Sequence, residues 1–268
     1  MVRLHVANLD GKIVLITGAT DGLGRALAAA AKDAGATVLV HGRDPGRIAD
    51  TVAGLGGDVR SYQADLAELA QVRTLAEQVT GAEPRLDVLV NNAGIGATVP
   101  GGGRRQESAD GYELRFAVNY LAGFALTRLL LPLLETSAPS KIVNVSSAGQ
   151  QAIDFSDVML TRRYDGIRAY CQSKLAQILF TKDLAEQLND TDVTVNALHP
   201  ATFMPTKMVP SPISTIAEGV EATMQLVADD IGTGKYFNGL REARADRQAY
   251  DPAARRELRD LSEKLTGL

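Results

Sequence analysis

A glycine-rich segment near the N-terminus, TGATDGLG at positions 17–24, separates an apolar run from an alanine-rich one. The run before it, KIVLI at 12–16, is rich in β-branched residues and predicts a buried strand. The run after it, at 25–34, has high helix propensity, and Gly35 follows where a helix C-cap is expected. A strand, a tight turn and a helix in this order are typical of the first unit of an α/β fold with a parallel sheet.

The same alternation continues along the chain. Further strands are expected at 36–42, 58–65, 86–94, 141–149 and 193–200, and helices at 68–80, 112–134, 168–188 and 215–228. The polar stretch at 43–57 predicts no regular element, and the Gly- and Arg-rich segment 96–112 predicts a surface loop. We therefore expect an α/β fold, a doubly wound sheet of about seven mainly parallel strands with helices on both faces. An amphipathic helix at about 252–267 closes the chain, and residues 1–268 are expected to form one domain.

The composition limits the partners that the chain can have. Lys and Arg number 28 against 32 Asp and Glu, a net charge of -4, so no global positive field attracts nucleic acid or anionic membranes. Cys171 is the single cysteine and can form no internal disulfide, and no His or Cys stands at metal-ligand spacing. No run of roughly 18 apolar residues predicts a membrane span. We expect a cytoplasmic protein with no metal, nucleic-acid or membrane partner.

The glycines of the N-terminal turn, Gly18, Gly22 and Gly24, suit a loop that approaches a pyrophosphate closely. Glycine allows a tight turn, and the N-terminus of the next helix offers unpaired N–H groups and a partial positive charge. A strand-to-helix turn without any ligand can carry the same glycines. In this chain the turn follows the first strand of an alternating series of strands and helices, and this position favours dinucleotide binding.

The end of the second predicted strand, VLVHGRDP, bears on the choice of nucleotide. An acidic residue at this point of a dinucleotide fold bonds the adenosine ribose and favours NAD, whereas arginine accommodates a 2′-phosphate. Gly42 occupies the expected acid position and Arg43 follows it, which favours NADP(H) over NAD(H). Asp44 weakens this prediction, and an exposed loop arginine without a ligand remains an alternative.

Three polar residues suggest proton transfer. Tyr170 and Lys174 stand four residues apart in a predicted helix and so share one face. A tyrosine that exchanges protons near neutral pH needs its pKa lowered by about 3 units, which a nearby lysine ammonium and a cationic nicotinamide could supply. Ser147 ends a predicted strand at the sheet edge where open α/β folds bind ligands, and its hydroxyl could hold a substrate carbonyl.

Together these motifs resemble the short-chain dehydrogenase/reductase family over nearly the whole chain: TGATDGLG, NNAG at 91–94, Asn119, Ser147, and Tyr170 with Lys174. The segment AYCQSKLAQILFTKDLA at 169–185 and the long stretch 148–169 are most similar to the retinol-dehydrogenase-like branch, which mostly uses NADP(H). The resemblance implies a Rossmann-like fold. It also implies pairing into a homodimer or homotetramer.

The resemblance implies a role for each site residue. Tyr170 would be the catalytic acid–base, and Lys174 would bind the nicotinamide ribose and lower the tyrosine pKa. Ser147, rather than Ser146, would orient the carbonyl, and Asn119 would sit in a helix irregularity and hold a water of a proton relay. An expected contact to the adenine amine comes from Asp65. The full set of expected cofactor contacts is Gly18, Thr20, Asp21, Gly22, Leu23, Gly24, Arg43, Asp65, Leu66, Asn91, Ala93, Gly94, Tyr170, Lys174, Pro200 and Thr202.

The segment after Pro200, HPATFMPT, departs from the family pattern. Ala201 stands where the family has glycine and Pro205 where it has threonine, so Thr202 or Thr206 would take over the contact to the nicotinamide carboxamide. Residues 200–217 are expected to form the substrate loop. Apolar side chains near the nicotinamide hint at an apolar pocket, although core packing is their commoner role; they are Phe155, Met159, Tyr164, Phe203, Met204 and Met208.

We therefore expect an oxidoreductase of the carbonyl reductase type. It would transfer a hydride between NADP(H) and a small or medium apolar aldehyde, ketone or secondary alcohol. The alternative is a non-enzymatic protein that senses NADP(H) or binds a partner. The presence of Asn119, Ser147, Tyr170 and Lys174 together argues against that alternative, because a sensor needs no group for proton transfer.

Overall fold

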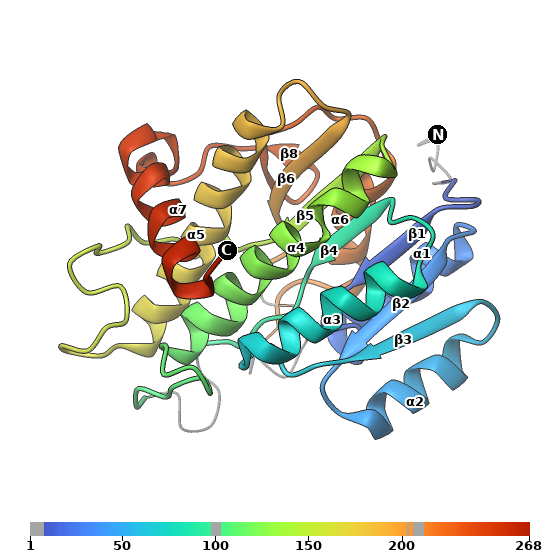
Figure 1. Cartoon of the computed structure of the whole chain (residues 1–268), viewed down its shortest axis with the longest axis horizontal. Helices are drawn as coiled ribbons and strands as arrows, with labels where there is room; N and C mark the ends of the chain where they lie inside the picture. Colours follow the sequence, from blue (N-terminus) through green and yellow to red (C-terminus); the bar gives the residue numbers. More distant parts are fainter. Residues whose placement is uncertain (1–7, 98–102, 203, 206–211) are drawn as a thin grey trace.

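The computed structural model describes residues 8–97, 103–202, 204–205 and 212–268 (Figure 1). Within these residues eight strands form one sheet in the order β3-β2-β1-β4-β5-β6-β7-β8. The first seven strands pair in parallel, and β8 runs antiparallel to β7. The strands are β1 (Ile13–Ile16), β2 (Thr37–Gly42), β3 (Val59–Gln63), β4 (Val88–Asn91), β5 (Ser140–Val145), β6 (Val193–His199), β7 (Tyr236–Asn238) and β8 (Arg241–Glu242).

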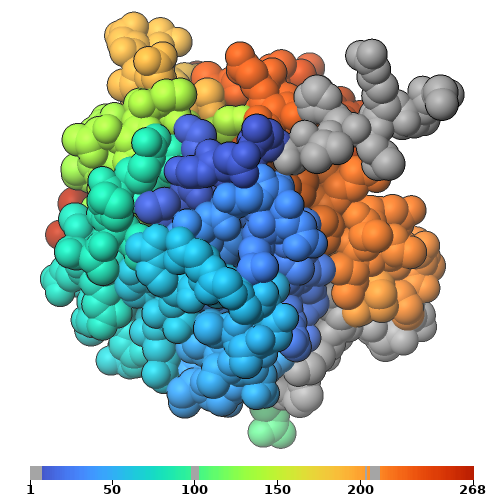
Figure 2. Space-filling model, turned by 90° about the vertical axis from the view of Figure 1, so that its right-hand side faces the viewer, coloured from blue at the N-terminus to red at the C-terminus, as the bar shows by residue number. Residues whose placement is uncertain are grey.

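Helices cover both faces of this sheet, which confirms the doubly wound α/β architecture. The helices are α1 (Gly22–Asp33), α2 (Pro45–Leu55), α3 (Leu69–Ala82), α4 (Ala122–Thr136), α5 (Gly166–Gln187), α6 (Ile216–Ala228) and α7 (Pro252–Thr266). One apolar core lies between one face of the sheet and the helices α1 and α6. Figure 2 shows these two helices side by side, α1 in blue and α6 in orange. A second core lies on the other face, under α3, α4 and α5, with α7 outside α5 (Figure 1).

Helix α2 was not predicted, and it replaces the expected polar stretch after the second strand. Its start carries two local signals. The carboxylate of Asp44 accepts a hydrogen bond from the backbone N–H of Arg47 at 2.9 Å, and Pro45 occupies the first helical position. Both features favour a helix N-terminus. Ile48 and Thr51 are its buried residues, so much of α2 faces solvent.

The helical stretch Phe116–Thr136 is the one segment of the described chain long and apolar enough to cross a membrane by length and composition. The expectation that no such segment exists was therefore wrong on this criterion. Of its most apolar 18-residue window, 61% is buried inside the protein. The stretch packs against α3 and α5, which accounts for its apolar character.

Helix α7 is anchored to the helices of the second core by polar contacts. The hydroxyls of Tyr120 and Ser262 lie 2.7 Å apart, and both residues are buried. In α5, the carboxylate of Asp183 is 3.1 Å from the guanidinium of Arg259. The last helix thus covers part of the surface formed by α4 and α5. Pairing into a homodimer or homotetramer stays a prediction.

The position of the site follows from the strand order. The chain moves outward in one direction from β1 to β2 and β3, and in the other direction from β4 onward. Open α/β sheets bind ligands in a crevice at the carboxyl ends of the two strands where this direction reverses, here the neighbours β1 and β4. The residues that follow Ile16 and Asn91 form this crevice.

Candidate active site

The loop after β1, the glycine loop of residues 17–24, is packed so closely that no side chain fits at Gly18 or Gly24. Gly18 and Gly22 have positive φ angles of 65° and 49°. A Cβ added to Gly24 would lie 2.2 Å from the carbonyl oxygen of Gly18, so no larger residue fits there. Asp21 caps α1 and accepts a hydrogen bond from the N–H of Gly22 at 2.9 Å. A bare backbone turn that leads into a helix N-terminus fits a bound pyrophosphate, as predicted for a dinucleotide.

Two residues that the sequence analysis missed hold this loop. The backbone N–H of Gly18 donates to Nδ1 of His41 at 3.2 Å, and Nε2 of His41 lies 3.2 Å from the carbonyl oxygen of Ala64. An N–H can only donate and a carbonyl can only accept, so His41 is neutral with its proton on Nε2. Burial lowers the pKa of His41 to about 4. On the other side, Nδ2 of Asn92 donates to the carbonyl oxygen of Thr17 at 2.8 Å.

The end of β2 lies against the glycine loop. A Cβ added to Gly42 would be 2.6 Å from the Cγ2 atom of Thr20, and the exposed Arg43 follows directly. The guanidinium of Arg47, in the first turn of α2, lies 2.5 Å from the carboxylate of Asp21. The fold thus brings the predicted residues Thr20, Asp21 and Arg43 to one edge of the crevice. Arg47 was missed because the helix that carries it was not predicted.

The predicted adenine side lies just beyond β3. Oδ1 of Asp65 accepts a hydrogen bond from the N–H of Ala67 at 2.9 Å, and Leu66 is buried. The preceding residue, Ala64, is the one whose carbonyl contacts His41. His41 therefore joins the glycine loop, at Gly18, to the backbone directly before Asp65 and Leu66.

The NNAG segment continues from β4 into the crevice. The side chain of Asn91 is turned into the protein, where Nδ2 donates to Thr127 and Asn144 at 2.9 Å each. It is therefore engaged inside the fold. The backbone comes closer to the expected site: a Cβ added to Gly18 would lie 2.9 Å from Cα of Ala93. A Cβ added to Gly94 would lie 3.5 Å from Nζ of Lys174.

Asn119 lies in the π-helical segment Phe116–Leu121, which is the helix irregularity that the resemblance implied. Its Oδ1 accepts from the N–H of Ile95 at 2.7 Å, and its Nδ2 donates to the carbonyl of Ile95 at 3.1 Å and to Oγ of Ser173 at 3.0 Å. The side-chain amide thus fixes the segment after β4 in place. The expected role of Asn119 in holding a water stays a prediction.

The two serines at the end of β5 have different partners. Oγ of Ser146 donates to the carbonyl oxygen of Lys174 at 2.7 Å and is buried in the fold. Oγ of Ser147 instead accepts a hydrogen bond from the backbone N–H of Gly149 at 3.0 Å, on the side of Tyr170. The carbonyl oxygen of Ser147 accepts two more, from the hydroxyl of Tyr236 at 3.1 Å and from Nε2 of Gln150 at 2.9 Å. The backbone of Ser147 is therefore held from two sides.

Burial raises the pKa of Tyr170, and the neighbouring hydroxyl of Ser147 acts in the opposite direction. Nζ of Lys174 lies 5.9 Å from the centre of the Tyr170 ring and donates to the carbonyl of Val145 at 2.8 Å and to Oε1 of Gln177 at 3.0 Å. Burial lowers the pKa of Lys174 to about 7. The protein groups around Tyr170 therefore do not by themselves produce the lowered tyrosine pKa that the resemblance implied.

The segment after β6 is described in part. Pro200 is buried, and Oγ1 of the exposed Thr202 lies 3.0 Å from Nε2 of His199. Thr206, together with Phe203 and Met208, lies outside the described residues. A substrate loop at 200–217 thus stays a prediction. In the described part of the chain, no three His, Cys, Asp or Glu side chains gather where they could hold a metal ion.

Comparison with known proteins agrees with this geometry. The family model of the short chain dehydrogenases matches residues 12–215. Mouse retinol dehydrogenase 13 is 38% identical over 98% of this chain and 86% of its own length. Human retinol dehydrogenase 14 is 36% identical over 97% of this chain and 88% of its own length.

Solved structures show the same likeness. The crystal structure of an uncharacterised protein from Mycobacterium paratuberculosis has a TM-score of 0.83 and 31% identity, and covers 97% of this chain and 95% of that one. The complex of RhlG from Pseudomonas aeruginosa with NADP has a TM-score of 0.71 and 29% identity, with coverage of 86% and 95%. From the family match, the near full-length relatives and the shared fold, the chain belongs to the short-chain dehydrogenase family.

Proposed function

We propose that this protein interconverts a carbonyl and an alcohol with NADP(H) as cofactor. The observation that carries the proposal is the convergence of Ser147, Tyr170 and Lys174 beside Gly94, at the carboxyl end of the sheet. When bound, the nicotinamide would supply or accept the hydride. Tyr170 would exchange the proton with the substrate oxygen, and Ser147 would hold that oxygen through its hydroxyl.

The lysine has a separate task in this proposal. Nζ of Lys174 already uses two acceptors, the carbonyl of Val145 and the amide oxygen of Gln177. An ammonium donates three hydrogen bonds, so one donor remains for a ribose hydroxyl on the side of Gly94. Its positive charge beside the ring of Tyr170 would favour the phenolate during proton transfer.

Arg43 and Arg47 support NADP(H) over NAD(H). Both follow β2, where a 2′-phosphate would lie. The residue directly before Arg43 is Gly42, which packs against Thr20 and leaves no room there for an acidic side chain. One carboxylate oxygen of Asp44 is already bonded to the N–H of Arg47, as the cap of α2. The likeness to a protein solved as an NADP complex agrees with this choice.

The relatives named retinol dehydrogenase support a small or medium apolar aldehyde, ketone or secondary alcohol as substrate. Ile167, one turn before Tyr170 on α5, is 61% exposed, and Ile213 is 72% exposed. Two other candidates are engaged elsewhere: Phe155 packs on the core and Tyr164 bonds to Arg115. Met159 also packs on the core, whereas Phe203 and Met208 lie outside the described residues, so the apolar pocket stays part of the proposal.

The test is a titration of purified protein with NADPH and then NADH, followed by the emission of the bound reduced nicotinamide. The chain has no Trp, so its own emission interferes little. We expect NADPH to bind more tightly than NADH. The preference should shrink in Arg43→Ala and persist in Arg241→Ala, a matched exposed arginine on β8. Equal affinity for both nucleotides in the native protein would overturn the choice of NADP(H).

Turnover separates the enzyme from the alternative of a nucleotide sensor. All-trans-retinal and decanal, tested with NADPH, should be reduced by the native protein. Tyr170→Phe should abolish turnover while the Kd for NADPH stays almost unchanged. Tight NADPH binding without turnover of any aldehyde, ketone or alcohol in a broad panel would favour the sensor.

Location in the cytoplasm remains a proposal, supported by the single cysteine.

A further inference from the structure

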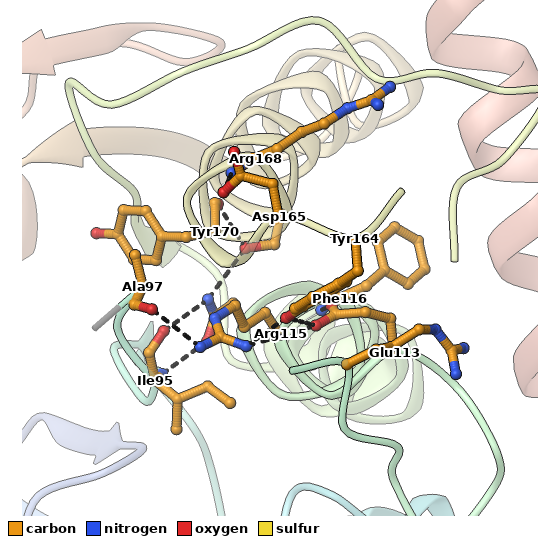
Figure 3. Close-up of polar contacts among 12 residues, drawn as sticks. Ile95, Ala97, Glu113, Arg115, Phe116, Tyr164, Asp165, Arg168 and Tyr170 are labelled. Atoms are coloured by element: carbon orange, nitrogen blue, oxygen red, sulfur yellow. Dashed lines mark hydrogen bonds and ion pairs between the residues drawn. The ribbon is translucent and has the colours of Figure 1, made fainter. Parts of the chain in front are cut away.

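A buried arginine lies between two segments of the proposed active site. Arg115 has no exposed surface, and its guanidinium bonds to three groups (Figure 3). Nε donates to the carbonyl of Gly96 and Nη2 to the carbonyl of Ala97, both at 3.1 Å. Nη1 donates to the hydroxyl of Tyr164 at 2.6 Å. The planar guanidinium thus joins two successive backbone carbonyls to one side chain, a geometry that lysine cannot reproduce.

Glu113 completes this cluster and is also buried. The hydroxyl of Tyr164 donates to its Oε1 at 3.0 Å, and the N–H of Phe116 donates to its Oε2 at 2.7 Å. The closest approach of the two charges, Nη1 of Arg115 to Oε1 of Glu113, is 3.7 Å. Tyr164 therefore bridges the cation and the anion. Burial and the charge of Glu113 raise the pKa of Tyr164 to about 12, so the hydroxyl keeps its proton.

The cluster connects the parts of the fold that flank the reacting groups. Gly96 and Ala97 directly follow Ile95, whose backbone is held by Asn119. Tyr164 directly precedes Asp165, which caps α5, and Tyr170 lies in the first turns of that helix. Figure 3 shows Arg115 between the segment of Ile95 and Ala97 and the start of α5. Through this cluster, the segment after β4 and the helix of Tyr170 hold a common position.

The charge of Arg115 costs stability, because a buried ion pair is rarely better than apolar residues of the same size. Its value therefore lies in the geometry that it fixes. We propose that Arg115, with Glu113 and Tyr164, is a positioning residue that sets the distance between the segment 93–97 and Tyr170. This inference rests on the proposed function, because that distance determines how a nicotinamide beside Gly94 faces the hydroxyl of Tyr170.

The test compares Arg115→Met, Arg115→Lys and Tyr164→Phe with Arg255→Met. Arg255 is the matched control: it is buried, pairs with Glu186 at 2.6 Å, and lies on α7. Each variant is measured for Tm, for the Kd of NADPH, for the emission of bound NADPH, and for kcat and KM with all-trans-retinal or decanal. Tyr164→Phe removes a single hydroxyl, so the comparison holds even where Arg115→Met folds poorly.

We expect Arg115→Met to lower kcat by about tenfold to a hundredfold, as for a small misplacement of reacting groups, with a nearly unchanged Kd for NADPH. Arg115→Lys should not restore kcat. Tyr164→Phe should show a smaller loss in the same direction. Both Arg115 variants should also alter the emission of bound NADPH, which reports the surroundings of the nicotinamide without any turnover. Arg255→Met should leave kcat, the Kd for NADPH and the emission of bound NADPH at their native values, because its partner Glu186 is exposed to water and lies outside the cluster.

Native kcat and native emission in folded Arg115→Met and Tyr164→Phe would overturn the inference. So would a loss of kcat that merely follows the unfolded fraction, because that is what a structural role predicts. Absence of turnover in the native protein would instead contradict the proposed function, and the emission of bound NADPH would still test the positioning role. Absence of NADPH binding in the native protein would overturn both.

Discussion

Nζ of Lys174 lies 3.0 Å from Oε1 of Gln177, one turn further along α5. The lysine is buried, and burial lowers its pKa to about 7. Unfolding releases it to water, where the pKa is 10.5, so the buried lysine reduces stability most below pH 7 and not at all above pH 10.5. The proposed active site is thus held at a cost in stability.

Lys174→Met is therefore expected to raise Tm while it abolishes turnover. The gain in the free energy of unfolding should be largest near pH 7. It should shrink by about 1.4 kcal/mol per pH unit as the pH rises toward 10.5. Thermal unfolding at several pH values measures this. Tyr170→Phe on the same helix should also abolish turnover, without the pH-dependent gain. A Tm difference independent of pH would show that burial of charge is not the cause.

His41 predicts a loss of stability in mild acid. The unfolded histidine binds a proton below pH 6.5, whereas the folded one, whose pKa is about 4, does so only below pH 4. Stability should fall as the pH drops from 6.5 to 4, by about 3 kcal/mol. His41→Gln can still accept from Gly18 and donate to Ala64 but does not titrate, so it should lose less stability over this range. Urea unfolding of both proteins between pH 6.5 and 4 measures this difference. If the free energy of unfolding depends on pH equally in both, the buried, neutral state of His41 is contradicted.

Gly24→Ala should abolish nucleotide binding. The new Cβ would lie 2.2 Å from the carbonyl of Gly18 and 2.5 Å from Nδ2 of Asn92, so the loop must move. Gly81→Ala in α3 is the control, because nothing lies within 4 Å of its added Cβ. We expect Gly81→Ala to keep the native affinity for NADPH and to gain about 0.5–1 kcal/mol of stability from the higher helix propensity of alanine. Native affinity in Gly24→Ala would refute the role of the loop.

Tyr236→Phe should reduce kcat, because the carbonyl of Ser147 loses one of its two donors. The lost hydrogen bond should also lower stability by about 1 kcal/mol. Tyr120→Phe removes a buried hydroxyl bonded to Ser262, outside the proposed site, and should lower stability with native kcat. Steady-state kinetics and thermal unfolding of the pair measure both effects. Equal kcat in the two variants would mean that Tyr236 does not position Ser147.

Much of the fold could be predicted because its strands are short, apolar and regularly separated. The strands β1 and β2, with clear β-branched runs, were found close to their observed ends, whereas the strand predicted at 141–149 extends four residues beyond β5. The hairpin of β7 and β8 was not located, since strands of three and two residues carry little pattern of their own. They form because β6 offers a free edge, which is a tertiary property.

The site was predictable where a residue type is itself informative. Glycines mark the loop proposed to bind the nucleotide, and the spacing of Tyr170 and Lys174 places them on one helix face. His41 and Arg115 were missed because their partners are backbone groups of Gly18, Gly96 and Ala97, which leave no trace in the sequence. The raised pKa of Tyr170 was missed for a related reason: burial is a property of the folded protein.

Helix α7 has a consequence for how the protein is made. Its contacts join Ser262 to Tyr120 and Arg259 to Asp183, so they link α7 to segments synthesised well before it. During translation, these segments leave the ribosome while the helix that covers them is still missing. The uncovered α4–α5 surface is then open to chaperones and to other nascent chains. A chain that stops before residue 252 lacks these contacts and keeps that surface uncovered.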